Sequence, residues 1–176
     1  MLRILYPNMY VPSVTAINPQ ELRERGIHNL LLDLDNTIVP RDHNRFSPQI
    51  NNWLQGLMDK GFKLCIVSNN STGRVKNVAG PLQVPTVVRA VKPLPGAFLR
   101  GMRLLGAKTG NTAIIGDQIF TDILGGNMLG LFTVLVVPLP GKEFWVTKMV
   151  NRRLEKLILY DISRRVSHKD KMYHVR

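Results

Sequence analysis

Short apolar runs that alternate with helical segments constrain the fold of this chain more than any other feature of its sequence. Five compact apolar runs are typical of buried strands, and they occupy residues 29–34, 62–67, 86–88, 112–115 and 132–137. Helices are predicted before and between them, at residues 19–25, 48–60, 72–79, 95–105 and 119–128. Strands that alternate with helices form a parallel sheet covered on both faces. We therefore expect an α/β fold of three layers with a five-stranded parallel sheet.

The length and composition fit one folded domain with short extensions. The chain has 176 residues, of which 44% are hydrophobic, enough to bury a core without disulfides. Its single cysteine, Cys65, lies in an apolar run, which predicts a buried thiol. We expect an N-terminal segment with a short helix at 1–29, irregular over 1–18, a main domain at 30–140 and a basic helical C-terminal extension at 141–176.

The charge balance points to an anionic partner. The chain has 24 Lys and Arg residues against 12 Asp and Glu residues, a formal net charge of +12. Such a chain is attracted to nucleic acid, an acidic lipid surface or a phosphorylated substrate, although basic residues also serve solubility alone. Residues 1–10 lack the apolar core of a signal peptide, and the longest apolar run, 128–139, is too short to span a bilayer. We expect an intracellular protein that is not secreted and has no transmembrane helix.

Two carboxylates, Asp33 and Asp35, follow the first predicted strand in a sequence that continues with Asn36 and Thr37. Side chains two residues apart point the same way along an extended chain, so these acids repel each other unless a cation lies between them. Mg²⁺ prefers a few carboxylates together with waters and phosphate oxygens. The pair is therefore a candidate half-site for magnesium, although Asp-Asn-Thr is also ordinary turn chemistry.

Polar residues also follow the later strands. Ser68 and Asn69 begin a strand–helix junction, where a hydroxyl and backbone amides hold a phosphate or simply cap a helix. Lys92 precedes the next helix and would place a positive charge beside a phosphoryl group. Asp117 follows the fourth strand and is able to complete a metal site, with Asp122 about one helical turn beyond it. Because ligands of parallel sheets bind at the carboxyl ends of the strands, we expect these residues to converge there.

In the order and spacing of these motifs, residues 30–137 resemble the DxDxT branch of the haloacid dehalogenase superfamily of phosphohydrolases. The first motif is matched by the run from Asp33 to Thr37, the second by Ser68, the third by Lys92, and the fourth by Gly116-Asp117 with Asp122. The resemblance implies a Rossmann-like, haloacid dehalogenase-like fold. It also implies a Mg²⁺-dependent phosphatase that acts through a phosphoaspartyl intermediate.

The resemblance assigns catalytic and phosphate-binding roles to five residues. Asp33 would attack phosphorus, which splits a difficult displacement into two steps. Asp35 would protonate the leaving oxygen and then activate the water that hydrolyses the intermediate. Ser68 and Asn69 would hold phosphate oxygens, and Lys92 would add a positive charge beside them.

The same resemblance implies the ligands of the metal. Mg²⁺ would be bound by Asp33, by the backbone carbonyl of Asp35 and by Asp117, and it would shield the anionic nucleophile from the anionic substrate. Thr37 and Asp122 would support these groups without binding the metal, Asp122 by orienting Lys92 or the waters of the metal.

The superfamily's large cap domains have no room in this chain. They are inserted after the first strand or between the second and third, where residues 37–62 leave space for a loop and one helix and residues 71–90 for less. An open site suits a bulky or surface-bound substrate. A closer resemblance, carried by the same motifs and by residues 115–127, is to a capless bacterial family related to phosphatidylglycerophosphate phosphatases. It implies production of phosphatidylglycerol in phospholipid biosynthesis, with a phospholipid head group as substrate.

The C-terminal extension is consistent with membrane contact. From residue 142 onward there are ten basic and four acidic residues. A helix there would carry Val150 and Leu154 on one face and Lys148 and Arg152 on another, the pattern of a helix at a lipid interface. A helix that packs on the sheet has the same pattern. We expect a cytoplasmic protein that binds peripherally to the anionic inner face of the membrane.

Two other functions remain open at this stage. A capless phosphatase could instead act on a soluble nucleotide, sugar phosphate or phosphoprotein. A protein of a different class would bind nucleic acid through a basic surface on a retained phosphatase fold, with aromatic residues stacking on bases. The complete set of catalytic motifs argues against a purely binding role. No specific protein partner is predicted.

Overall fold

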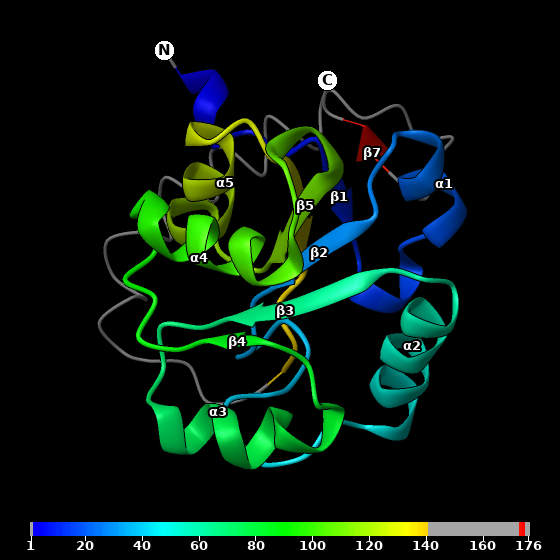
Figure 1. Ribbon diagram of the computed structural model, residues 1–176, viewed down its shortest axis with the longest axis vertical. Coiled ribbons are helices and arrows are strands. Elements are labelled where there is room, and N and C mark those ends of the chain that lie inside the picture. The colour runs from blue at the N-terminus through cyan, green and yellow to red at the C-terminus, as the bar shows by residue number, and fades with distance from the viewer. Residues whose placement is uncertain (1, 141–172, 175–176) are drawn as a thin grey trace.

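One sheet, covered by helices on both faces, organises the part of the chain that the computed structural model describes, residues 2–140 and 173–174 (Figure 1). Its strand order is β4-β3-β2-β5-β6-β1-β7. Every neighbouring pair is parallel except β1 and β7, which are antiparallel. The strands are β1 (Met9–Val11), β2 (Asn29–Leu32), β3 (Lys63–Val67), β4 (Thr86–Val87), β5 (Thr112–Gly116), β6 (Phe132–Val136) and β7 (Tyr173–His174).

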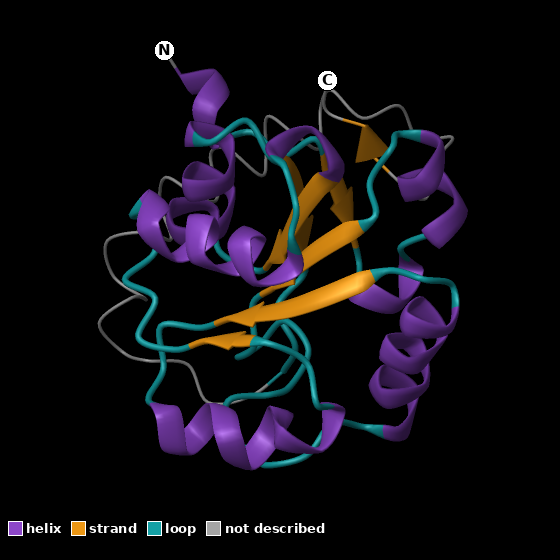
Figure 2. Ribbon diagram, viewed as in Figure 1, coloured by secondary structure: helices purple, strands orange, loops and turns teal. Residues whose placement is uncertain are grey.

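Five α-helices connect the parallel strands, as the alternation of orange strands and purple helices in Figure 2 shows. They are α1 (Pro19–Glu24), α2 (Pro48–Asp59), α3 (Thr72–Ala79), α4 (Pro95–Leu105) and α5 (Leu124–Met128). A π-helical turn, η5 (Ile119–Ile123), leads into α5, and the 3₁₀ turns are η1 (Leu2–Leu5), η2 (Val14–Ala16), η3 (Gly80–Leu82) and η4 (Thr109–Asn111). Among the described residues, no helix combines the length and apolarity needed to cross a bilayer.

Local sequence signals explain where several helices begin and end. The Asn18 side chain accepts a hydrogen bond from the N–H of Gln20 over 3.0 Å at the start of α1, and Ser47 accepts from Ile50 over 3.3 Å at the start of α2. Proline follows both caps, in the first helical position, where its missing N–H costs no hydrogen bond. Helix α4 ends at Leu105, and the next residue, Gly106, has a φ of 63° that suits glycine.

The two faces of the sheet bury two separate apolar clusters. All four residues of the central strand β2 are buried. Leu30 and Leu32 pack in the cluster that includes side chains of α1, α2 and α3, whereas Leu31 packs in the cluster under α4. Successive residues of a strand point to opposite faces, so a strand covered on both sides carries apolar side chains on both of its faces. This is why the strands appear in the sequence as continuous apolar runs.

The α/β fold and the parallel arrangement of the five predicted strands are confirmed. Cys65 is buried as expected, and burial raises the pKa of its thiol to about 12. The expectation of an irregular chain over residues 1–18 was wrong, because β1 adds a sixth parallel strand beside β6. β1 has three residues, too few to show a strand periodicity in the sequence. The extension at 141–176 lies outside the described residues, apart from β7.

Helix α5 approaches the sheet at a glycine, and this contact can be tested by mutation. A Cβ atom on residue 126 would lie 2.4 Å from Cγ2 of Ile114 and 2.7 Å from Cγ2 of Thr133. We predict that Gly126→Ala lowers the free energy of unfolding by about 1–3 kcal/mol, because the helix must move away from β5 and β6.

Urea unfolding measures this effect, with Gly56→Ala as the matched control. A Cβ atom at position 56 of α2 meets nothing within 4 Å, so this variant should gain up to about 1 kcal/mol from helix propensity. Equal stability of the two variants would contradict the packing described for α5.

Candidate active site

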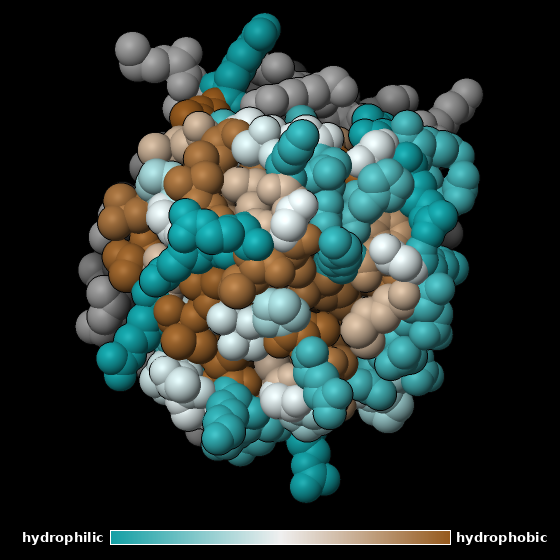
Figure 3. All heavy atoms as spheres, in the orientation of Figure 1, coloured by the Kyte–Doolittle hydropathy of each residue, from teal (hydrophilic) through white to brown (hydrophobic). Residues whose placement is uncertain are grey.

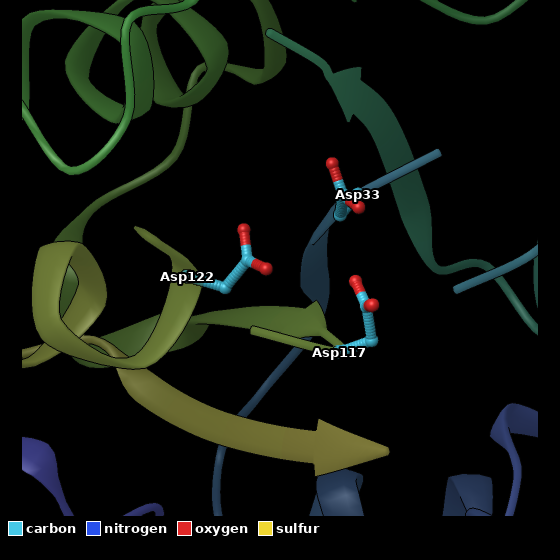
Figure 4. Close-up of side chains that lie close together, drawn as sticks. All are labelled: Asp33, Asp117 and Asp122. Carbon is cyan, nitrogen blue, oxygen red and sulfur yellow. The ribbon is translucent and has the colours of Figure 1, made fainter. Parts of the chain in front are cut away.

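The carboxyl ends of two adjacent central strands bring acidic side chains together. Asp33 directly follows β2 and Asp117 directly follows β5. The N–H of Asp33 continues the pairing of these parallel strands by donating to the carbonyl oxygen of Ile115 over 2.9 Å. Figure 4 shows both carboxylates and that of Asp122, from η5, around one small space. One oxygen of each carboxylate lies within 4.8 Å of the others.

Lys92 supplies positive charge to this cluster. Its Nζ lies 2.5 Å from Oδ1 of Asp33 and 2.6 Å from Oδ1 of Asp122, and the residue is only 7% exposed. The backbone N–H of Lys92 donates to Oδ1 of Asn69 over 2.8 Å, so the turn after β3 holds the segment that carries the lysine. Short, charge-assisted hydrogen bonds of this kind are the strong ones. Lys92 therefore joins the segments that follow β2, β3 and β5.

Gly116 leaves the space that Asp122 occupies. A Cβ atom on residue 116 would lie 2.3 Å from Cγ of Asp122, which is completely buried. Oδ2 of Asp122 accepts from the N–H of Gln118 over 3.2 Å, while Oδ1 accepts from Lys92. Protein donors thus engage both oxygens, which is the arrangement expected of a residue that orients Lys92.

A tight loop after β2 returns Thr37 to the cluster. Asn36 adopts a φ of 60°, a left-handed conformation that asparagine tolerates, and its N–H donates to the carbonyl oxygen of Val39 over 2.7 Å. The buried Thr37 hydroxyl then lies 3.1 Å from Oδ1 of Asp117 and 3.3 Å from Oδ2 of Asp33. Thr37 therefore contacts both acids that follow the central strands.

The cluster has more negative charge than its lysine balances. Burial raises the pKa of Asp33 to about 6, although Lys92 acts in the opposite direction. Burial, followed by repulsion from Asp33 and Asp122, raises the pKa of Asp117 well above its usual value. Burial lowers the pKa of Lys92, but the combined attraction of Asp122 and Asp33 outweighs it and the net shift is upward. A divalent cation would relieve the excess, and carboxylate oxygens are ligands that Mg²⁺ prefers.

The carboxylate of Asp35 is held by two residues that the sequence did not identify. Nη2 and Nε of Arg74 lie 2.8 and 3.1 Å from its Oδ1, and Nδ2 of Asn70 donates to its Oδ2 over 2.9 Å. Nη1 of Arg74 also donates to the carbonyl oxygen of His43 over 2.6 Å and to Oδ1 of Asn44 over 2.9 Å. Arg74 therefore connects Asp35 to the loop that precedes α2.

One signal in the sequence favours a special role for Arg74. It lies in the first turn of α3, where the helix dipole disfavours a positive charge, so a cation there indicates a nearby anion. The signal does not say which anion. For Asn70 the sequence offers no comparable signal, because asparagine after a strand is ordinary turn chemistry.

A small polar cavity opens beside the cluster. It has a volume of about 170 Å³ and is lined by Asp33, Asp35, Asn36, Arg41, Ser68, Asn69, Asn70, Ser71, Lys92, Gln118 and Thr121. Ser68 is buried and its Oγ accepts from the N–H of Asn70 over 3.1 Å, whereas Asn69 is exposed. A larger cavity of about 480 Å³, between α1 and the end of α2, has Asp59 as its one acidic lining residue. The small cavity is therefore the candidate active site.

No large cap domain covers this cavity in the described part of the chain. Between β2 and β3 the structure has α2 and loops, and between β3 and β4 it has α3 and η3.

Known proteins resemble this chain in sequence and in fold. Residues 13–130 match the family model described as haloacid dehalogenase-like hydrolase. The "Probable phosphatase YqeG" of Bacillus subtilis is 37% identical over 163 residues, which are 93% of this chain and 94% of that protein. The chloroplastic phosphatidylglycerophosphate phosphatase 1 of Chlamydomonas reinhardtii is 25% identical over 161 residues, which are 85% of this chain and 59% of that protein.

A solved structure shows the same fold. The cobalt-bound deoxy-D-mannose-octulosonate 8-phosphate phosphatase of Haemophilus influenzae superposes with a TM-score of 0.50 at 17% identity, over 77% of this chain and 89% of that chain. At this identity the likeness concerns the fold alone.

We predict that the stability of the metal-free protein falls as pH rises through the pKa of Asp33. An unfolded aspartate has a pKa of about 3.9, and the folded protein raises that of Asp33 to about 6. The folded state binds the proton more tightly, so the stabilisation is complete below about pH 4 and is lost as pH rises through about 6. Urea unfolding in a chelator should show less of this fall in Asp33→Asn than in the wild type. Equal pH dependence in both proteins would contradict the prediction, and Asp59→Asn on the exposed end of α2 is the matched control.

We predict that Arg74→Met opens the loop at residues 40–44. The variant loses charge-assisted hydrogen bonds worth about 1.5–3 kcal/mol each, which corresponds to about tenfold or more in local opening. Hydrogen exchange of this loop should accelerate in Arg74→Met and not in Arg100→Met, an exposed arginine on α4. Unchanged exchange would show that the loop is held by other contacts.

Proposed function

This chain belongs to the family of haloacid dehalogenase-like hydrolases, and we propose that it hydrolyses the terminal phosphate ester of phosphatidylglycerophosphate to give phosphatidylglycerol. The contact of Lys92 with Asp33 at the end of β2 is the observation that carries the phosphatase chemistry. The lipid is suggested by the name of the Chlamydomonas relative. An open site above a small cavity agrees with that suggestion.

Asp33 is the nucleophile of the proposed reaction. One of its carboxylate oxygens attacks phosphorus, so that a bond from Asp33 to phosphorus forms and the bond from phosphorus to the glycerol oxygen breaks. Lys92, fixed 2.5 Å from Asp33, offsets the negative charge that the phosphoryl group brings into a buried site. Asp35 gives its proton to the departing glycerol oxygen.

Hydrolysis of the phosphoaspartate completes the proposed cycle. A water attacks phosphorus, Asp35 takes its proton, and inorganic phosphate leaves as the Asp33 carboxylate is restored. In the proposed reaction Ser68 and Asn69 bind phosphate oxygens, and their place in the lining of the cavity supports this role. Asp122 keeps Lys92 in place, and Thr37 keeps the two acids in place, through the contacts described above.

Magnesium fits the charge of the site. Asp33, Asp117 and the backbone carbonyl of Asp35 would hold the ion, which would shield the anionic nucleophile from the anionic phosphate. The three clustered carboxylates and the upward pKa shifts of Asp33 and Asp117 support this part of the proposal.

The size of the cavity favours a substrate whose bulk lies outside it. Pockets that enclose a small ligand have volumes of about 300–1,000 Å³, whereas this cavity has about 170 Å³. It is large enough for a phosphate and a few neighbouring atoms. A phospholipid meets this condition, because its acyl chains stay in the bilayer while the head group enters the site. The proposal therefore includes peripheral binding to the cytoplasmic face of the membrane, with residues 30–140 as the catalytic domain and 141–176 as the basic extension.

Phosphate release from phosphatidylglycerophosphate in mixed micelles with Mg²⁺ tests the proposal. We predict release by the wild type and a loss of at least about 10³-fold in kcat for Asp33→Asn, because loss of a covalent nucleophile removes a whole reaction path. Asp59→Asn, on the exposed end of α2, removes one carboxylate far from the cluster and should retain full activity.

A generic phosphate ester, assayed in parallel, separates the chemistry from the substrate. Turnover of the ester without turnover of the lipid would refute the lipid substrate and leave the phosphatase chemistry intact. No turnover of either compound would refute both.

A further inference from the structure

The turn that carries Lys92 presents two apolar side chains to solvent. The N–H of Leu94 donates to the carbonyl oxygen of Val91 over 3.0 Å, which closes a turn over residues 91–94. Val91 is 62% exposed and Leu94 is 59% exposed, whereas Lys92 between them is 7% exposed and reaches Asp33. The two apolar side chains therefore belong to the same turn as the lysine that contacts Asp33.

The backbone of this turn is strained at a residue whose side chain is mostly exposed. Val91 has a φ of 56°, a left-handed conformation that is a genuine outlier for a β-branched residue. Strain of this kind clusters at ligand-binding and active sites. Asparagine or glycine would relieve the strain, and a polar side chain would suit the exposure. The described part of the chain therefore gives no packing reason for valine at this position, whereas an apolar partner would give one.

One arginine lines the cavity, and two more lie in segments that adjoin it. Arg89, two residues before Val91, is exposed, and its N–H donates to the carbonyl oxygen of Asn70 at the rim of the cavity. Arg41 lines the cavity, and Arg45 is exposed in the loop that follows it. Apolar side chains flanked by arginines match a surface that is anionic outside and hydrocarbon inside.

The figures show where this turn lies. The loop from β4 into α4 runs along the left margin of Figure 1, and apolar side chains gather at that margin and across the face over α4 in Figure 3.

We propose that Val91 and Leu94 insert into an anionic lipid bilayer and hold the opening of the active site against the membrane surface. This inference rests on the proposed lipid substrate, and it names the surface by which the enzyme meets that substrate. The bilayer accepts the two apolar side chains, anionic head groups face Arg41, Arg45 and Arg89, and the phosphate of a lipid in the same leaflet reaches Asp33.

Co-sedimentation of the full chain with vesicles of phosphatidylcholine and phosphatidylglycerol in equal parts tests the proposal. The variant Val91→Asn with Leu94→Ser removes both apolar side chains without harming the fold. Asparagine tolerates the left-handed backbone at position 91, and serine is a preferred residue at position 94, which caps α4. The partition coefficient of this variant should be lower than that of the wild type by at least about tenfold, since burying one valine or leucine contributes at least that factor.

Leu104→Ser is the matched control. It removes a leucine of similar exposure at the far end of α4 and should leave vesicle binding unchanged. The urea concentration at which half of the double variant is unfolded should equal or exceed that of the wild type. The double variant should also turn over a soluble phosphate ester at the wild-type rate, while its KM for the lipid in vesicles rises.

Four results would overturn the proposal. The wild type does not sediment with vesicles, the double variant sediments as much as the wild type, or Leu104→Ser loses as much vesicle binding as the double variant. The fourth is a loss of activity of the double variant on the soluble ester, which would mean that the turn acts through Lys92. The vesicles contain no phosphatidylglycerophosphate, so a wrong substrate leaves the sedimentation result unaffected.

Discussion

A single buried ammonium group, shared by two carboxylates, holds together the chain segments that form the candidate active site. Lys92 reaches Asp33 after β2 and Asp122 in η5, and its own backbone is held by Asn69 after β3. Three buried charges cannot remain in a protein interior unless each one is paired. Moving any of these segments would leave a charge without a partner, so the segments keep one mutual arrangement.

The arrangement depends equally on the parallel direction of the strands in the sheet. Parallel strands end on the same edge, and the register of β2 against β5 sets Asp33 beside Asp117. Space is the second requirement, because the carboxylate of Asp122 lies where a side chain at Gly116 would be. The motif Gly-Asp at the end of β5 is therefore one structural unit, in which the glycine admits a buried acid and the aspartate joins it in the cluster.

Periodicity and strand-end chemistry were sufficient to predict the α/β fold, its five central strands and part of the cavity lining, including Asp33, Ser68 and Lys92. Both signals depend on local sequence, and a parallel sheet brings the residues at the ends of its strands close together in space. The sequence did not predict β1, which is too short for a period, or the contact of Arg74 with Asp35, which joins residues 39 apart across a helix and a loop. The left-handed backbone of Val91 was also hidden, because valine is not a residue that signals such a turn.

The position of β1 has a consequence for how the chain is made. Val11 pairs with Val136, so β1, which precedes the other described strands in the chain, borders β6, the last strand of the main domain to be synthesised. Residues 9–11 have no parallel partner on the ribosome until β6 has emerged, whereas β2 can pair with β3 much earlier. Contacts of such long sequence separation form late because the intervening loop must close first. Strand β1 thus joins the sheet only once every residue of the candidate active site has been translated.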